Sequence, residues 1–226
     1  MKNLYIFLAA VIIVACTSCK NETNNDPATA DPEKTIVEKI AAANGLENFD
    51  NVQELKYTFN VKVNDSLRTS RAWTWEPKTN RVTLTTKDST VAYDHKTEAA
   101  NHEWVDQRFI NDQYWLLFPF HLVWDKMEWK HEEKAIAPIS GEEMQSMTIT
   151  YPSDIGYTPG DVYEVFFDDN FMIQEWIYRS GGNPENAFPA TWEDYKDFGG
   201  IKIATRHTSK DGSFVLFFDG IEVVRE

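Results

Sequence analysis

Apolar and polar residues alternate with a period of two over much of the chain. Leu55, Tyr57, Phe59, Val61 and Val63 share one face of an extended segment, and the residues between them are polar. This alternation is typical of an antiparallel strand with one face buried and the other in water. Similar segments predict about ten strands in all, at 55–63, 68–75, 81–85, 91–95, 147–151, 161–167, 171–178, 191–196, 201–208, 213–218 and 221–224.

A helix is predicted before the first strand. Asp31-Pro32 supplies a capping carboxylate followed by proline at the first helical position. Apolar residues at positions 36, 37, 40 and 41 form one face, and Asn44-Gly45 is a typical helix end. We therefore expect a helix of about thirteen residues that packs on the sheet.

Residues 103–129 break the alternation. They carry more large apolar side chains than one helix face could bury against a sheet, and Pro119 lies among them. Because proline disrupts a helix interior, this segment is predicted to form one or two short helical turns followed by an extended piece.

The first nineteen residues resemble an export signal. Lys2 is the only charge before an apolar run at 4–15, and a helix of that length spans roughly 18 Å, too short for a bilayer core of about 30 Å. A basic start and a short apolar core are typical of a secretory signal. The four residues Ile13-Val14-Ala15-Cys16 resemble the bacterial lipobox, which implies cleavage before Cys16 and a diacylglycerol anchor with acyl chains such as palmitate on its sulfur.

Cys19 is the second choice for the anchor, because Cys16 would then stand where the lipobox needs an aliphatic residue. The stretch 20–31 has no large apolar residue and cannot offset the entropy of ordering, so it is predicted to be flexible. The expected organisation is a signal peptide at 1–15, a tether at 16–31 and a single domain at 32–226.

Composition narrows the partners of this domain. The 226 residues contain 22 Lys plus Arg against 36 Asp plus Glu, a formal charge of −14, which disfavours nucleic acid and electrostatic attraction to anionic lipid. The membrane would therefore be held by the lipid anchor. Both cysteines lie in the first nineteen residues, so the predicted domain has no thiol, disulfide or thiolate metal ligand.

An export signal, one helix and a run of about ten antiparallel strands resemble the LolA/LolB-like family. Four stretches also resemble uncharacterised lipoproteins of Bacteroidota; they are Gly45-Leu46-Glu47, Tyr114-Trp115-Leu116-Leu117-Phe118-Pro119-Phe120, Gly156-Tyr157-Thr158-Pro159-Gly160-Asp161 and Trp192-Glu193-Asp194-Tyr195. The resemblance implies a mainly β (α+β) half-barrel, in which a curved antiparallel sheet wraps a short helical plug and leaves an apolar cavity. We further expect a monomer in the bacterial cell envelope, anchored by lipid in the outer membrane on its periplasmic or surface face.

Aromatic residues are the candidate ligand-binding set. A cavity that they line would gain roughly 0.8 kcal/mol for each buried methylene of an acyl chain. Two other interpretations stay open: the rings fill the core, or exposed Trp side chains stack on sugar. The predicted set is Tyr57, Phe59, Trp73, Trp75, Trp104, Trp115, Phe118, Phe120 and Trp124.

Metal and catalytic chemistry find little support. His95 and His102 lie near acidic residues and could bind a divalent ion, but their spacing matches no short motif, so a solvated loop is favoured. The acidic turns lack the calcium-loop pattern. The nucleophile, zinc and phosphate-loop motifs G-x-S-x-G, S-x-x-K, H-E-x-x-H and the Gly-rich loop are missing from the sequence. No enzyme activity, metal or cofactor is therefore predicted.

These sequence features leave three functional hypotheses. The favoured one is a lipid-anchored carrier or sensor that binds an acyl chain or another apolar ligand. The second is a structural or interaction lipoprotein with a filled core. The third is a glycan or lipid hydrolase, which would need clustered carboxylates or His–carboxylate pairs in a cleft.

Overall fold

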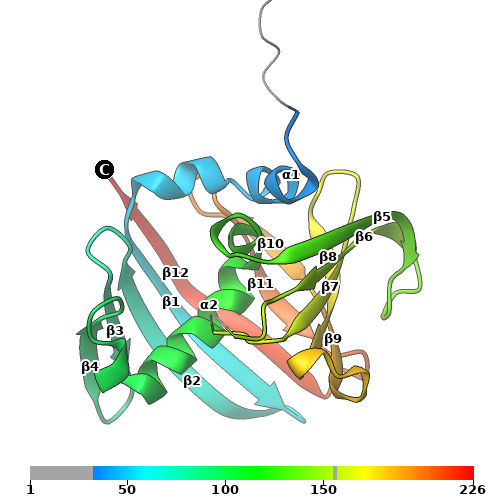
Figure 1. Cartoon of the computed structure of the whole chain (residues 1–226). Helices are drawn as coiled ribbons and strands as arrows, with labels where there is room; N and C mark the ends of the chain where they lie inside the picture. Colours follow the sequence, from blue (N-terminus) through cyan, green and yellow to red (C-terminus); the bar gives the residue numbers. More distant parts are fainter. Residues whose placement is uncertain (1–32, 155–156) are drawn as a thin grey trace, which may run out of the picture. The chain divides into compact units, whose positions relative to one another are not determined.

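The computed structural model describes residues 33–154 and 157–226, and residues 34–226 form one compact unit. The predicted signal, Cys16, Cys19, the tether and Asp31-Pro32 lie outside the described residues. Two antiparallel sheets and one long helix, α2, make up most of this unit (Figure 1).

The first helix is shorter than predicted. Helix α1 spans Ile36–Ala43, and Thr35 caps it: the Thr35 hydroxyl accepts from the Glu38 backbone N–H, and the Glu38 carboxylate accepts from the Thr35 N–H at 2.7 Å. This reciprocal pair fixes the start four residues later than a cap at Asp31 would. The chain turns at Gly45, where φ is 86° and a Cβ would lie 1.8 Å from the Gly200 carbonyl oxygen, and a short helix η1 (Leu46–Asn51) follows.

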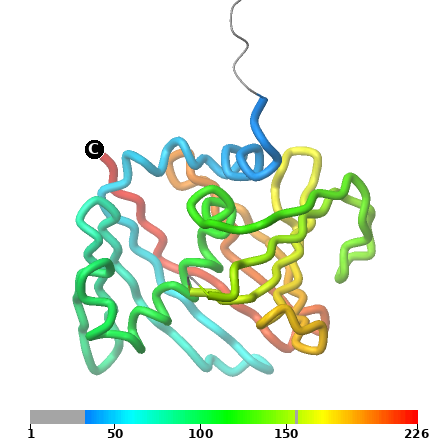
Figure 2. Tube along the Cα trace, in the orientation of Figure 1, coloured from blue at the N-terminus to red at the C-terminus, as the bar shows by residue number. Residues whose placement is uncertain are grey.

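The larger sheet contains seven strands in the order β10-β11-β12-β1-β2-β3-β4. Its centre is the pair of β1 and β12, which brings the first strand and the last strand of the chain side by side (Figure 2). The strands are β1 (Val52–Val63), β2 (Ser66–Glu76), β3 (Arg81–Thr85), β4 (Thr90–Asp94), β10 (Glu193–Asp197), β11 (Lys202–Thr208) and β12 (Phe214–Arg225).

The smaller sheet contains five strands in sequential order, β5-β6-β7-β8-β9. An isolated bridge between Ala190 and Ser209 joins it to the end of β11, and neither sheet closes on itself. The strands are β5 (Glu128–Ile136), β6 (Glu143–Thr150), β7 (Val162–Phe167), β8 (Ile173–Arg179) and β9 (Ala187–Thr191), and short helices η2 (Ala99–Asn101), η3 (Ser180–Gly182) and η4 (Pro184–Asn186) lie between elements.

The predicted mainly β class is confirmed, with differences in detail. Strands β5 and β9 were not predicted; β5 is an edge strand rich in exposed charged residues, which blunt such an edge and hide the alternation. The segments predicted at 213–218 and 221–224 are one strand, β12. Its register against β1 shifts between Lys56 and Thr58, opposite Asp219-Gly220, so this dipeptide forms an irregularity within the strand and not a turn.

The prediction for residues 103–129 was wrong about the length of the helical part. Residues Glu103–Trp124 form α2, which consists of two helical stretches joined by a kink at Leu117 (φ −126°, ψ 23°), two residues before Pro119. The predicted extended piece follows as the start of β5 at Glu128. Proline lacks an N–H and crowds the preceding turn, which explains the bend without ending the helix. Helix α2 contacts both sheets, as its ring contacts with Trp73 and with Trp176 show, and a helix buried on several sides is apolar nearly all round.

Candidate functional site

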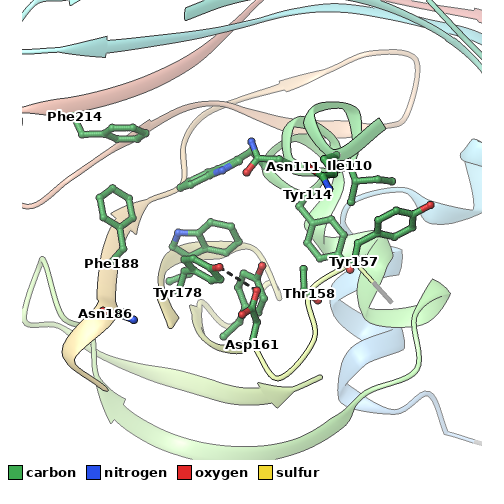
Figure 3. Close-up of a pocket in the computed structure, with 14 residues that line it drawn as sticks. Ile110, Asn111, Tyr114, Tyr157, Thr158, Asp161, Tyr178, Asn186, Phe188 and Phe214 are labelled. Carbon is green, nitrogen blue, oxygen red and sulfur yellow. Dashed lines mark hydrogen bonds between the residues drawn. The ribbon is translucent and has the colours of Figure 1, made fainter. Parts of the chain in front are cut away.

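A cavity of about 480 Å³ lies between α2, the five-stranded sheet and the start of β12 (Figure 3). This volume is within the range of small-molecule sites, roughly 300–1,000 Å³. Eight of its fourteen lining residues are aromatic. The lining comprises Gln107, Ile110, Asn111, Tyr114, Trp115, Tyr157, Thr158, Asp161, Tyr163, Trp176, Tyr178, Asn186, Phe188 and Phe214.

One face of α2 forms a wall of the cavity. Its lining residues are Gln107, Ile110, Asn111, Tyr114 and Trp115, which recur at i, i+3, i+4, i+7 and i+8. Residues at this spacing lie on one side of an α-helix. The Trp115 ring packs edge-on against Trp176, with centroids 4.5 Å apart, so the wall is continuous with the sheet.

A row of rings across three strands forms the opposite wall. Tyr163 on β7 is paired with Tyr178 on β8, and Tyr178 is paired with Phe188 on β9. Residues paired in this way point to the same face of an antiparallel sheet, and Trp176 shares that face because it lies two positions from Tyr178. The Tyr163 and Tyr178 rings are 5.1 Å apart, and burial raises the pKa of both phenols.

Asp161 is the charged residue among the cavity's lining residues, and it is 8% exposed. Its Oδ2 accepts from the Tyr178 hydroxyl at 3.0 Å, and its Oδ1 accepts from the Gly181 backbone N–H at 2.7 Å (Figure 3). Both donors are neutral. The structure shows no Lys, Arg or His salt bridge to Asp161 among the described residues.

The other side of α2 carries a closed ion pair. The Arg71 guanidinium donates to both oxygens of Asp112, at 2.7 and 2.6 Å, and the Trp73 indole donates to Oδ2 at 2.8 Å. Asp112 is fully buried; burial raises the pKa of its carboxyl, while Arg71 acts in the opposite direction. The Arg71 guanidinium also lies over the Phe59 ring, 4.6 Å from the centroid. The Asp112 carboxylate is therefore compensated by the protein itself.

A second pocket, of about 660 Å³, lies on this side and shares Ile110, Tyr114 and Tyr157 with the cavity. Asp125 accepts there from His121 Nδ1 at 3.0 Å and from the Tyr151 and Tyr114 hydroxyls. Burial raises the pKa of Asp125, but these hydrogen bonds outweigh burial and the pKa is lowered.

A His–carboxylate pair is part of a general-base arrangement. His121 Nε2 has no hydrogen-bond partner among the described residues, and the pocket's lining contains no Ser, Thr or Cys in the described part of the chain. The arrangement therefore offers an imidazole without a neighbouring covalent nucleophile.

The two histidines considered for metal binding have other partners. His95 Nδ1 lies 2.6 Å from Asp106, which also accepts from the Tyr93 hydroxyl, and the His102 ring packs on Tyr93 with centroids 5.2 Å apart. Among residues 33–154 and 157–226, no group of three potential metal ligands comes together.

The predicted aromatic set is dispersed by the fold. Trp115 lines the cavity, and Trp75 and Trp124 line the second pocket. Trp104 is 53% exposed. The remaining members are buried in the core: Tyr57, Phe59, Trp73, Phe118 and Phe120. Their role in ligand binding stays a prediction.

Most of the cavity's sheet side was missed by the sequence analysis. Asp161 was interpreted as a turn residue, and Tyr163, Trp176, Tyr178, Phe188 and Phe214 were not singled out. One signal was present: Trp176 and Tyr178 alternate on the strand predicted at 171–178, and Tyr163 lies on the strand predicted at 161–167.

No family model matches this chain, and no curated protein matches it. Three solved structures are similar. A DUF1329 family protein from Desulfovibrio piger has 8% identity and a TM-score of 0.46, covering 85% of this chain and 93% of that one. A LolA superfamily protein from Nitrosomonas europaea has 9% identity and a TM-score of 0.47, covering 84% and 93%. The lipoprotein LppX of Mycobacterium tuberculosis has 10% identity and a TM-score of 0.27, covering 81% and 91%.

The second of these structures is named as a LolA superfamily protein, and the sequence of this chain resembles the LolA/LolB-like family. Similarities of this size say nothing about a ligand. In the described part of the chain, no helix has the length and apolar character needed to cross a membrane.

Proposed function

We propose that residues 34–226 bind an apolar ligand in the aromatic cavity under α2, and that the protein is a lipid-anchored carrier or sensor of the bacterial envelope. The observation that carries this proposal is the cavity itself, about 480 Å³ in volume and walled by eight aromatic side chains. Ligand sites are typically concave and lined mainly by apolar and aromatic side chains with a few polar groups, as this cavity is.

The favoured ligand is an acyl chain or another elongated apolar group. Its burial would contribute roughly 0.8 kcal/mol for each methylene group removed from water. The lining is not purely apolar, because Asn111, Thr158 and Asp161 place polar atoms at its wall. Such a site holds an apolar body and orients one polar end.

Anchoring through Cys16 supplies the membrane part of the proposal. Mass spectrometry of the mature protein, with palmitate labelling in a bacterial host, is expected to show acyl chains on the wild type and none on Cys16→Ser. Cys19→Ser is the matched control and should remain labelled. Labelling that is lost from Cys19→Ser and kept by Cys16→Ser would refute this assignment.

Ligand binding is tested on the full chain carrying Cys16→Ser, so that bound lipid is not confused with the anchor. Organic extraction and mass spectrometry of the purified protein should identify an apolar compound. Gln107→Trp places a bulky ring at the cavity wall and should lower the amount of extracted compound. Arg108→Trp is the control, because it adds the same ring to α2 outside the cavity lining.

The proposal fails if no compound is extracted and the protein also binds no added 1-octanol in calorimetry. It also fails if Gln107→Trp and Arg108→Trp reduce binding equally. In that case the aromatic residues would serve the core only.

A further inference from the structure

The charge of the cavity is one-sided. Asp161 is buried in its wall, and the fourteen lining residues include no Lys, Arg or His. The cationic groups behind the wall have other partners. Arg179, next to Tyr178, is paired with Glu164 at 2.9 Å. The rings of His121 and His95 pack on the lining residues Tyr114 and Tyr157, and these imidazoles are paired with Asp125 and Asp106. His207, behind Trp115, is kept neutral by burial, which lowers its pKa to about 3.

Asp161 also has unused capacity. Its two hydrogen-bond partners among the described residues, the Tyr178 hydroxyl and the Gly181 N–H, each occupy one oxygen, whereas a carboxylate accepts about four hydrogen bonds. A buried carboxylate without a cationic partner is costly, and a positive charge entering the cavity would supply that partner.

The aromatic walls favour the same kind of ligand. The faces of Trp, Tyr and Phe rings are electronegative, and they attract ammonium groups that carry alkyl substituents. Here Tyr178 and Phe188 are paired neighbours on β8 and β9, and Tyr178 is hydrogen-bonded to Asp161. The carboxylate therefore lies among aromatic rings, with Phe188 to one side of it and Tyr114 to the other (Figure 3).

We propose that the cavity selects organic cations: apolar molecules bearing an alkylammonium group, whose charge lies beside Asp161 and whose apolar part lies along Tyr163, Trp176 and Phe188. This inference rests on the proposed function and adds the chemical class of the ligand. An anionic amphiphile such as a fatty acid is disfavoured, because its carboxylate would face Asp161.

The test compares three probes with the same eight-carbon chain: octyltrimethylammonium, 1-octanol and octanoate. They are titrated calorimetrically into the full chain carrying Cys16→Ser. The expected order of affinity is cation, alcohol, anion, with a preference of about tenfold or more for the cation over the alcohol. Equal affinity for cation and alcohol overturns this inference and leaves the apolar site standing. No binding of any probe refutes the proposed function itself.

Asp161→Asn keeps the shape and removes the charge, so it should abolish the preference for the cation while 1-octanol still binds. Asp169→Asn is the matched control: it makes the same change of net charge at an exposed position outside the cavity, and the preference should persist. Phe188→Leu is a second variant, expected to weaken the cation more than the alcohol. If both Asp161→Asn and Phe188→Leu keep the full preference, the inference is wrong.

A lipid headgroup and a free organic cation share this chemistry. Competition with lysophosphatidylcholine separates them: displacement of octyltrimethylammonium from the wild type indicates a headgroup ligand, whereas retention of the probe indicates a free cation.

Discussion

Two buried carboxylates on different sides of α2, Asp112 and Asp161, have contrasting surroundings. Asp112 meets the bidentate guanidinium of Arg71, the Trp73 indole and the Asn111 amide, in a region packed by rings. Asp161 meets two neutral donors and borders an open volume. Burial alone does not separate them, because both are at most 8% exposed.

The two carboxylates therefore have different roles. A buried charge that is fully compensated by the protein fixes the position of an element, here α2 on β2. A buried charge that the protein leaves without a cation, next to a cavity, is available to a ligand. The contrast would be wrong if substitutions at the two sites changed the free energy of unfolding by the same amount.

The largest expected effect is at the closed pair. Arg71→Met leaves the Asp112 charge buried without its cation, and such losses cost about 3–5 kcal/mol. Urea unfolding followed by circular dichroism should show this loss in the free energy of unfolding. Asp161→Asn should cost about 1 kcal/mol, because it weakens two hydrogen bonds and strands no charge.

The double variant Arg71→Met with Asp112→Asn is the control for this result. It removes both charges and keeps an acceptor for Trp73, so it should recover a large part of the stability lost in Arg71→Met. If Arg71→Met destabilises no more than Asp161→Asn, the contrast between the two carboxylates is wrong.

A smaller effect comes from His207, the imidazole behind the cavity wall. Burial lowers its pKa to about 3, while its ordinary value in the unfolded chain is 6.5. Below pH 6.5 the unfolded chain binds a proton that the folded protein does not, so stability falls as the pH falls from 6.5 towards 3. The slope is about 1.4 kcal/mol for each pH unit, or roughly 2 kcal/mol between pH 6.5 and 5.

Urea unfolding across this pH range measures the slope. His207→Gln removes the titrating ring and should flatten the dependence, whereas His131→Gln, at a half-buried position outside the cavity, should not. An unchanged slope in His207→Gln would show that another group is responsible. It would also remove the evidence that His207 is neutral behind Trp115.

The strands could be predicted because one face of each was marked by alternation, as at Leu55, Tyr57 and Phe59. Helix α2 could not, because its exposed polar residues Glu103, Gln107, Arg108 and Asn111 occupy only its first half, whereas residues 112–122 are covered on several sides and show no polar face with the period of 3.6. Pro119 strengthened the wrong conclusion, since the helix accommodates it with a bend at Leu117.

The cavity was harder to predict than the fold. The cavity exists only because of the distance between the two sheets and α2, which the sequence does not show. An aromatic residue that fills the core also has the same sequence pattern as one that lines a cavity. Trp115 and Phe118 lie one turn apart on α2, yet the first lines the cavity and the second is fully buried. Asp161 gave no signal of its own, because an acidic residue before a strand is an ordinary turn residue.

The decisive measurement is a structure of the full chain with octyltrimethylammonium bound. We expect the ammonium group in the cavity under α2, within about 4 Å of the Asp161 carboxylate, with the alkyl chain against Tyr163 and Trp176. A probe that binds only in the second pocket, beside Trp75 and Trp124, or only on the surface, would contradict it.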